Sequence, residues 1–291
     1  MNPRLQALAW EERWSRPTAL AALAAVGFVI AAIVVATAGV GSGSGDADLL
    51  RHVNEHRSAQ MISSILQAIG VGLLVAPLYY LFRAANARSD RMRGQLVGVV
   101  IAAPLFLAAL AILSGISTLH AASDFVSNEV PHLIAKGIPL DSDRANELAK
   151  EAIDDAPLRP LAAGFGLGGQ LGFLVAMVYT CLYAMRVGLL PRFWGSLGMA
   201  LGAVSFIFFQ FALLWFVYLA FLLIGRVPGG KPPAWETGES MPWPSPGDKA
   251  AAAMSPPPED PPEADEYPAP SAEEAPQAEE QADPTEKGQS Q

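Results

Sequence analysis

Two histidines at helical spacing are the residues of this sequence best suited to chemistry. His52 and His56 enclose Val53-Asn54-Glu55 in the order H-x-x-E-H, a spacing in which two imidazoles bind zinc and the glutamate acts as a base. Side chains four residues apart share one face of a helix, so both rings would point the same way. His52 and His56 are therefore the candidate metal ligands, and Glu129 is a candidate third ligand from a neighbouring loop.

The surroundings of this motif argue against catalysis. It lies in a segment of about 20 residues, 41–60, between two apolar blocks, and this segment opens with a flexible Gly-Ser run. Hydrolases with this motif need a large soluble fold around the metal, which so short a segment cannot supply. The sequence therefore predicts ordinary solvated histidines, no cofactor and no enzymatic activity.

A stripe of small residues is the second pattern. Gly164, Gly168, Gly172 and Ala176 recur at intervals of four, so they share one helix face. Small residues let two helices approach closely in lipid. The stripe predicts tight packing against another helix of this chain, with contact to a second copy or to another membrane protein as the alternative.

Five long apolar blocks carry these patterns. None contains Asp, Glu, Lys, Arg or His, and Ala, Leu, Val and Gly dominate them without strict alternation. A helix needs about 20 apolar residues to cross about 30 Å of hydrocarbon. The sequence thus predicts an all-α, polytopic transmembrane helix bundle rather than a β-barrel. The blocks are residues 19–39, 61–82, 96–116, 161–183 and 194–224.

The fifth block leaves the number of spans open. As one helix it would be about 46 Å long, at about 1.5 Å per residue. No Gly, Pro, Asn or Asp lies between Ala203 and Ile224 to form a turn, which favours one tilted helix and five spans. The alternative is a hairpin near Phe208–Gln210 and six spans, which Arg226 and Lys231 support because the chain would then return to the arginine-rich side.

Arginine predicts the orientation. The flank 1–18 and the connections after the second and fourth blocks are rich in arginine, whereas the segments 41–60 and 119–160 are not. Basic connections remain in the cytoplasm, so we expect a cytoplasmic N-terminus and outer loops at 41–60 and 119–160. The first block is too long for a cleaved signal peptide, whose apolar region is usually about 7–15 residues, and is read as a retained anchor.

We expect a helix in one outer loop and a few polar residues inside the bilayer. In the outer loop 119–160, the apolar stripe over Asp143–Asp155 predicts an amphipathic helix that Asp141 or Ser142 caps. Within the apolar blocks, Gln67 and Gln170 could hydrogen-bond across helices, although ordinary helix packing is the favoured interpretation. The other polar residues at depth are Ser63, Ser64, Thr180 and Gln210, and ion-coupled carriers usually need ionisable groups there instead.

The C-terminal segment 226–291 has a different composition. It holds 15 of the 24 prolines, with 14 acidic and 4 basic residues. Such a segment buries too little apolar surface to offset its ordering entropy, so a disordered, acidic, proline-rich tail is expected. Since no basic cluster with interleaved aromatics occurs anywhere, nucleic-acid binding is not expected.

Two stretches, residues 188–202 (GLLPRFWGSLGMALG) and 229–239 (GGKPPAWETGE), resemble multi-pass membrane proteins of actinobacteria that have no assigned activity. The resemblance implies a bacterial plasma membrane and supplies no functional residue. The expected function is a structural or interaction role in that membrane. The alternative is a small-molecule transporter or a channel component.

Overall fold

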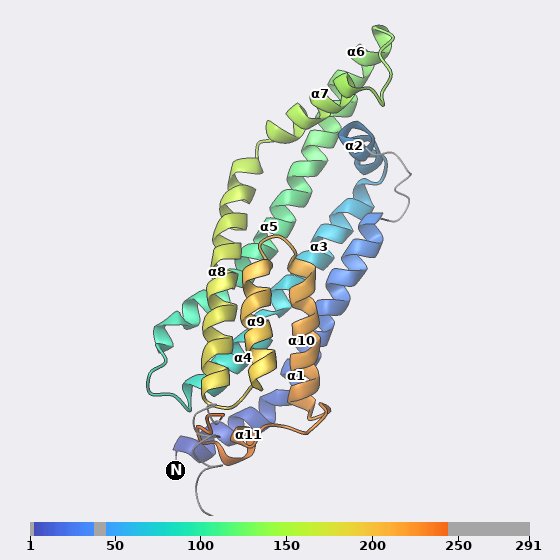
Figure 1. The fold of residues 1–291 in the computed structure, drawn as a ribbon. Helices are drawn as coiled ribbons and strands as arrows, with labels where there is room; N and C mark the ends of the chain where they lie inside the picture. Colours follow the sequence, from blue (N-terminus) through green and yellow to red (C-terminus); the bar gives the residue numbers. More distant parts are fainter. Residues whose placement is uncertain (1–2, 38–44, 244–291) are drawn as a thin grey trace, which may run out of the picture. The chain divides into compact units, whose positions relative to one another are not determined.

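The computed structural model describes residues 3–37 and 45–243, and every regular element among them is a helix. Four helical stretches are long and apolar enough to cross a membrane: Arg4–Thr37, Arg57–Asn86, Gly94–Ala135 and Arg159–Arg186. They pack side by side in Figure 1. The expected all-helical class is confirmed, and four candidate spans are found in the described residues where five, or alternatively six, were expected.

The four stretches consist of long helices. The first is α1 (Pro3–Thr37), and the second is α3 (Arg57–Leu73) followed by α4 (Val75–Asn86). The third is the short 3₁₀ turn η1 (Gly94–Leu96) and α5 (Val97–Asp124), and the fourth is α8 (Arg159–Arg186). The helix is interrupted at Leu74, three residues before Pro77, because proline has no N–H to continue the helical hydrogen bonds.

Small side chains allow these helices to lie close together. A methyl group added at Gly70 of α3 would lie 2.8 Å from the Ala25 carbonyl oxygen of α1. One added at Gly169 of α8 would lie 3.0 Å from the Leu107 amide nitrogen of α5. The backbones themselves are therefore in contact. Close contact increases the dispersion attraction between helices, which matters because lipid tails are as apolar as the side chains and the hydrophobic effect does not hold helices together there.

A separate small core lies at the end of the bundle that carries α2 (Asp46–Glu55). There the third stretch continues through the π-helical turn η2 (Phe125–Glu129) into α6 (Val130–Ala135), and α7 (Asp143–Asp154) packs on α2 and α5. The Ser142 hydroxyl accepts a hydrogen bond from the Ala145 amide at 3.3 Å. The predicted capped amphipathic helix is confirmed, and its stripe is buried in this core with Leu50 and Phe125.

The fifth apolar block differs from the single tilted helix expected over residues 194–224. It forms α9 (Arg192–Val204) and α10 (Phe209–Ile224), which pack on each other. Two contacts close the hairpin: the Trp194 and Tyr218 rings stack with centroids 3.6 Å apart, and the Trp215 indole donates to the Trp194 carbonyl at 3.0 Å. Folding back lets α9 pack on α8 and α10 pack on α1, whereas one long helix would leave much of its length without protein neighbours.

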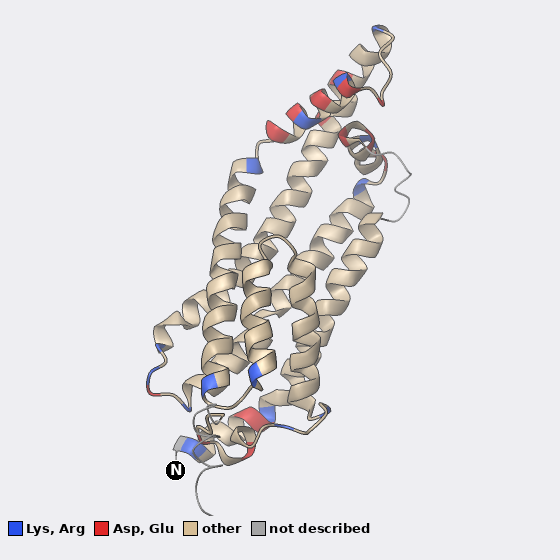
Figure 2. Cartoon of the chain, viewed as in Figure 1, with Lys and Arg blue, Asp and Glu red and all other residues tan. Residues whose placement is uncertain are grey.

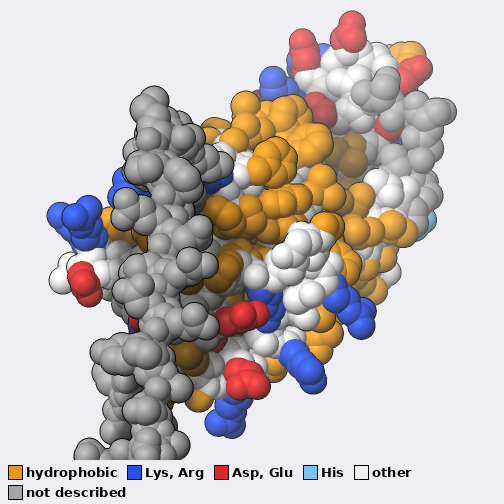
Figure 3. Space-filling view, turned by 60° about the horizontal axis from the view of Figure 1, so that its bottom comes forward, with side chains coloured by type: hydrophobic (Ala, Val, Ile, Leu, Met, Phe, Trp, Pro, Cys, Tyr) orange, Lys and Arg blue, Asp and Glu red, His pale blue; other side chains and the backbone are white. Residues whose placement is uncertain are grey.

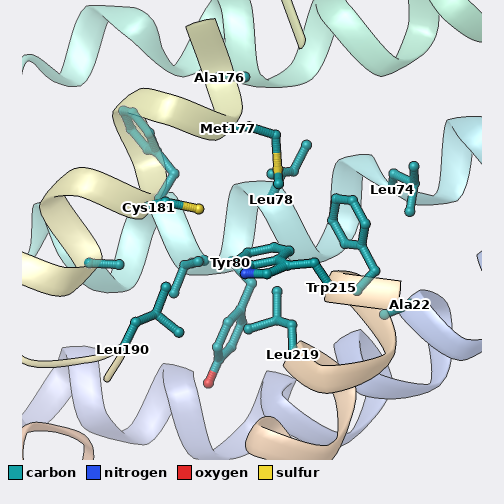
Figure 4. Packing of buried hydrophobic residues seen from close by; sticks show 14 of the residues in the cluster. Ala22, Leu74, Leu78, Tyr80, Ala176, Met177, Cys181, Leu190, Trp215 and Leu219 are labelled. Atoms are coloured by element: carbon teal, nitrogen blue, oxygen red, sulfur yellow. The ribbon is translucent and has the colours of Figure 1, made fainter. Parts of the chain in front are cut away.

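Figure 4 shows the core that this hairpin completes. Trp215 and Leu219 of α10 join Met177 and Cys181 of α8, together with Leu78 of α4, in one cluster of fully buried side chains. Truncation of a side chain as large as Trp215 costs about 3–5 kcal/mol in well-packed cores. The hairpin is therefore part of the body and not an appendage.

The hairpin returns the chain to the end that carries the N-terminus. Arg226–Trp243 follow it there, with the short helix α11 (Ala234–Thr237). The indoles of Trp235 and Trp243 donate to the carbonyls of Leu189 and Leu190, each at 2.9 Å. The described body thus extends past the expected tail boundary at 226, because both indoles hydrogen-bond to the α8–α9 connection and Trp235 is buried. Residues 244–291 lie outside the described residues.

Candidate functional site

The α9–α10 hairpin is too short to cross a bilayer. Helices of 13 and 16 residues are about 20 and 24 Å long at about 1.5 Å per residue, against about 30 Å of hydrocarbon. The ring of Phe209, at the hairpin tip, lies 5.4 Å from that of Phe173, near the middle of α8. The hairpin therefore ends at about half the depth of the bundle.

A cavity lies beside this tip, and we call it the glutamine cleft. Its volume is about 190 Å³, and five helices line it. Its residues are Val29, Ala32, Ile33 and Ala36 of α1, Ser63, Gln67 and Val71 of α3, Leu107 and Leu110 of α5, Gln170 of α8, and Phe209 and Gln210 of α10. A longer hairpin would extend further along these helices, so the hairpin's length determines where the cleft begins.

Three carboxamides and one hydroxyl supply the polar surface of the glutamine cleft. The Ser63 hydroxyl donates to the Ala32 carbonyl at 2.9 Å, so its proton is used within the protein. Gln67 and Gln210 are exposed, and the Oε1 atom of Gln170 is buried without a hydrogen-bond partner among the described residues. Leaving such a group unpaired in an apolar medium costs about 2–7 kcal/mol, so the Gln170 carboxamide is an incompletely satisfied polar group at the edge of the cleft.

The chemistry of the cleft is neutral. None of the described residues that line it is ionisable. A carboxamide offers two N–H donors and one carbonyl acceptor, so three of them can form hydrogen bonds with a small group that both donates and accepts. An ion would lose its hydration there without an opposite charge to replace it.

The sequence pointed to these polar residues but not to their arrangement. Gln67 and Gln170 do line one cavity, yet the Oε1 atom of Gln170 accepts no hydrogen bond from any described residue. Gln210 lines the same cavity because the fifth block folds back. The expectation of a single helix did not predict this position for Gln210. Ser64 instead donates to the Gln60 carbonyl at 3.0 Å, and the hydroxyl of Thr180 is buried without a partner among the described residues.

The two histidines of the H-x-x-E-H motif stack on each other. The rings of His52 and His56 lie 4.3 Å apart, and His56 Nδ1 is 3.2 Å from the His52 carbonyl oxygen. His56 lies at the junction of α2 and α3, outside the helix that holds His52. In residues 3–37 and 45–243, no group of three or more His, Cys, Asp or Glu side chains is arranged to hold a metal ion.

The small-residue stripe of α8 divides into two parts. Methyl groups added at Gly172 and Gly168 would lie 3.0 Å from the Ala103 Cβ and 3.5 Å from the Phe106 ring of α5, and Ala176 is buried. At Gly164 nothing lies within 4 Å. The neighbour of the stripe is therefore α5 of the same chain over much of its length, and the end at Gly164 is open.

A second cavity, of about 450 Å³, lies at the N-terminal end of the bundle. Its residues are Leu8, Glu11, Glu12, Ser15, Tyr80, Lys231, Trp235 and Glu236. Burial lowers the pKa of the Lys231 ammonium, and the neighbouring carboxylates of Glu11 and Glu236 oppose this shift. Sequence reasoning missed this cavity, since its residues include segments more than 200 positions apart, 8–15 and 231–236.

Comparison with protein-family models, with curated proteins and with solved structures finds no match to this chain.

Proposed function

We propose that this chain is a small-molecule carrier or a channel component whose glutamine cleft binds a small, neutral, hydrogen-bonding molecule. The observation that supports this is the end of a half-length hairpin beside the unpartnered Gln170 carbonyl. Non-helical backbone at membrane depth is tolerated where protein buries it or where it borders a cavity. Interrupted helices that end near the middle of the bilayer form the binding sites of many carriers.

We further propose a bacterial plasma membrane and a cytoplasmic N-terminus. Charged side chains gather at the two ends of the described body, with a broad hydrophobic surface between them (Figures 2 and 3). Among described residues, the N-terminal end carries 11 Lys or Arg and 5 Asp or Glu, and the opposite end carries 6 and 11. The excess of basic residues at one end favours the cytoplasm for that end.

A flux measurement in liposomes tests the proposed function. The purified chain is reconstituted, and entry of urea or glycerol is followed by light scattering against protein-free liposomes. We expect faster entry with the wild-type chain and a loss of this increase in Gln170→Leu, which removes the amide from the cleft. Gln95→Leu, an equal change at an exposed residue of η1 outside the cleft, is the matched control and should behave as wild type.

Equal entry of both solutes into protein-containing and protein-free liposomes would contradict a channel for them. A carrier would still be detectable as binding, since either solute should raise the melting temperature of the wild-type chain and not that of Gln170→Leu. The absence of both effects, with urea, glycerol and other small neutral solutes, would overturn the proposal.

A role in interaction is the second candidate, and the small core around α2 and α7 favours it. This part continues beyond the neighbouring ends of α3 and α8 in Figure 1 and has a core of its own. Ile134 of α6, at its end, is 64% exposed. A photo-crosslinker at Ile134 should capture a specific membrane partner in cells, and the same crosslinker at Lys150 of α7 is the control.

A further inference from the structure

A third cavity lies between the beginning of α1 and the end of α4; we call it the Arg83 cavity. Its volume is about 250 Å³. Among the described residues, it shares Glu11 with the second cavity and no residue with the glutamine cleft, so it is a separate place for a ligand. Its residues are Gln6, Ala7, Trp10, Glu11, Arg83, Asn86 and Ala87.

An aromatic ring holds the Arg83 guanidinium at this cavity. The guanidinium carbon lies 4.1 Å from the centre of the Trp10 ring. The Trp10 ring is fixed in turn, because it stacks on Tyr80 with centroids 5.2 Å apart and lies edge-to-face with Tyr79 at 6.5 Å. Arginine stacks on aromatic faces, and its planar fork of N–H donors matches the geometry of phosphate. The ring contact therefore positions the charge in advance of a ligand.

No carboxylate offsets the charge of Arg83. Within residues 3–37 and 45–243, this exposed side chain forms no ion pair and no hydrogen bond. Glu11 is the one acidic residue among the described residues that line the cavity. Both of its carboxylate oxygens accept hydrogen bonds from Arg88, and its side chain is 5% exposed. The Arg83 cavity therefore presents a positive charge to its surroundings.

The position of the Arg83 cavity matches the headgroup level of a bilayer. Arg83 lies in the last turn of α4, at the end of the second apolar stretch. Trp14 lies one turn beyond Trp10 along α1, towards the apolar part of that helix, and is 45% exposed. Gln6 and Asn86 lie on the other side of the Arg83–Trp10 pair, towards the ends of their helices. Since aromatic residues are enriched where hydrocarbon meets headgroups, the order from the membrane outwards is aromatic, cationic and then polar.

We infer that the Arg83 cavity binds the phosphate of an anionic phospholipid. Arginine pairs with phosphate through two parallel, charge-assisted hydrogen bonds, and the carboxamides of Gln6 and Asn86 add neutral N–H donors. Trp14 shares a helix face with Trp10 and then lies beside the upper part of the acyl chains. Basic pockets between helices on the cytoplasmic side bind anionic headgroups. This inference rests on the proposed membrane location and orientation and does not depend on the glutamine cleft.

Native mass spectrometry of the full chain tests the inference. Phosphatidylglycerol and phosphatidylcholine are titrated separately, since both carry a phosphate but the choline cation offsets the charge of the second. We expect tighter binding of phosphatidylglycerol, and about tenfold weaker binding of this lipid to Arg83→Gln, as for the loss of one hydrogen bond to a charged group. Arg226→Gln removes an exposed arginine at the same end, outside the cavity, and should bind as wild type.

Competition identifies the source of the phosphate. Inorganic phosphate and glycerol 3-phosphate should displace the lipid only in large excess, because the acyl chains contribute to binding. Full displacement at equal concentration would show that the ligand is a soluble anion and would overturn the inference.

Asn86→Ala removes one neutral donor and gives a second test if Arg83→Gln does not fold, with a smaller loss of binding expected. Equal binding of the two lipids, or an equal loss in Arg226→Gln, would overturn the inference. Unchanged binding in a folded Arg83→Gln, or in Asn86→Ala where Arg83→Gln does not fold, would do the same.

Discussion

Arg88 and Glu11 form a bidentate ion pair inside the protein. The Arg88 Nη2 atom donates to one carboxylate oxygen of Glu11 at 2.8 Å, and Nη1 donates to the other. The two side chains are 1% and 5% exposed. Arg88 also donates to the Ala84 and Ala234 carbonyls, at 2.9 and 3.1 Å, so this one side chain connects α1, the end of α4 and the segment that follows α10.

Removing Arg88 should therefore destabilise the protein strongly. In Arg88→Leu the Glu11 carboxylate stays buried without its partner, which typically costs about 3–5 kcal/mol. A marked fall in the melting temperature in detergent is the expected result. The double variant Glu11→Gln/Arg88→Leu removes the unpaired charge as well and should recover part of the loss. Equal melting temperatures for Arg88→Leu and wild type would show that the pair does not hold these segments together.

The sequence predicted the regular part of the fold well. Length and composition revealed the long apolar helices, and a stripe of apolar residues with a serine cap revealed α7, because both features depend on local spacing. Local spacing could not reveal the turn between α9 and α10. This turn has the sequence Ser205-Phe-Ile-Phe208, without Gly, Pro, Asn or Asp, because unpaired polar side chains would be costly inside an apolar layer.

Polar groups of this turn instead form hydrogen bonds with the preceding helix α9. The Ser205 hydroxyl donates to the Gly202 carbonyl at 2.7 Å, and the Phe208 amide donates to the Val204 carbonyl at 2.9 Å. Two signals for the hairpin were present: the glycines of α9, Gly198 and Gly202, which face Cys181 and Met177 of α8, and the basic residues after α10. The glutamine cleft could not be predicted from the sequence, because its position depends on how far the hairpin extends along the other helices.

Because the hairpin returns, the segments that precede it and follow it in the sequence should lie on the same side of the membrane. In a variant without Cys181, single cysteines at Ser89 and at Ser240 should react with an impermeant thiol reagent only from the cytoplasmic side, and one at Ser142 only from outside. Ser89 follows α4, and Ser240 lies beyond α11, so the two positions lie before and after the hairpin in the chain. Reaction of Ser240 and Ser142 from the same side would contradict the returning hairpin.

The stripe on α8 offers a matched pair of substitutions. Gly172→Leu should destabilise the folded chain by about 1–3 kcal/mol, as overpacking does, because a methyl group there already meets Ala103 at 3.0 Å. Gly164→Leu has open space and gains helix propensity, so its melting temperature should be unchanged or higher. A loss of dimer in Gly164→Leu, seen by light scattering with the fold intact, would instead show that a second copy covers this end.

Lys231 should behave as an unusually acidic lysine. Burial disfavours its charged form and lowers its pKa in the folded protein, so a larger fraction is neutral at any pH below its ordinary value. The folded state then binds fewer protons than the unfolded state, and raising the pH towards the unfolded value stabilises the protein. The acylation rate of each lysine is measured by mass spectrometry over a pH series and divided by that lysine's own maximum rate at high pH. The midpoint, which is the pH at half-maximum, should be lower for Lys231 than for the exposed Lys150. In Glu236→Gln, which removes a carboxylate that opposes the shift, the midpoint should fall further. A midpoint for Lys231 at or above that of Lys150 would show that solvent reaches the ammonium and that the cavity around it is open in solution.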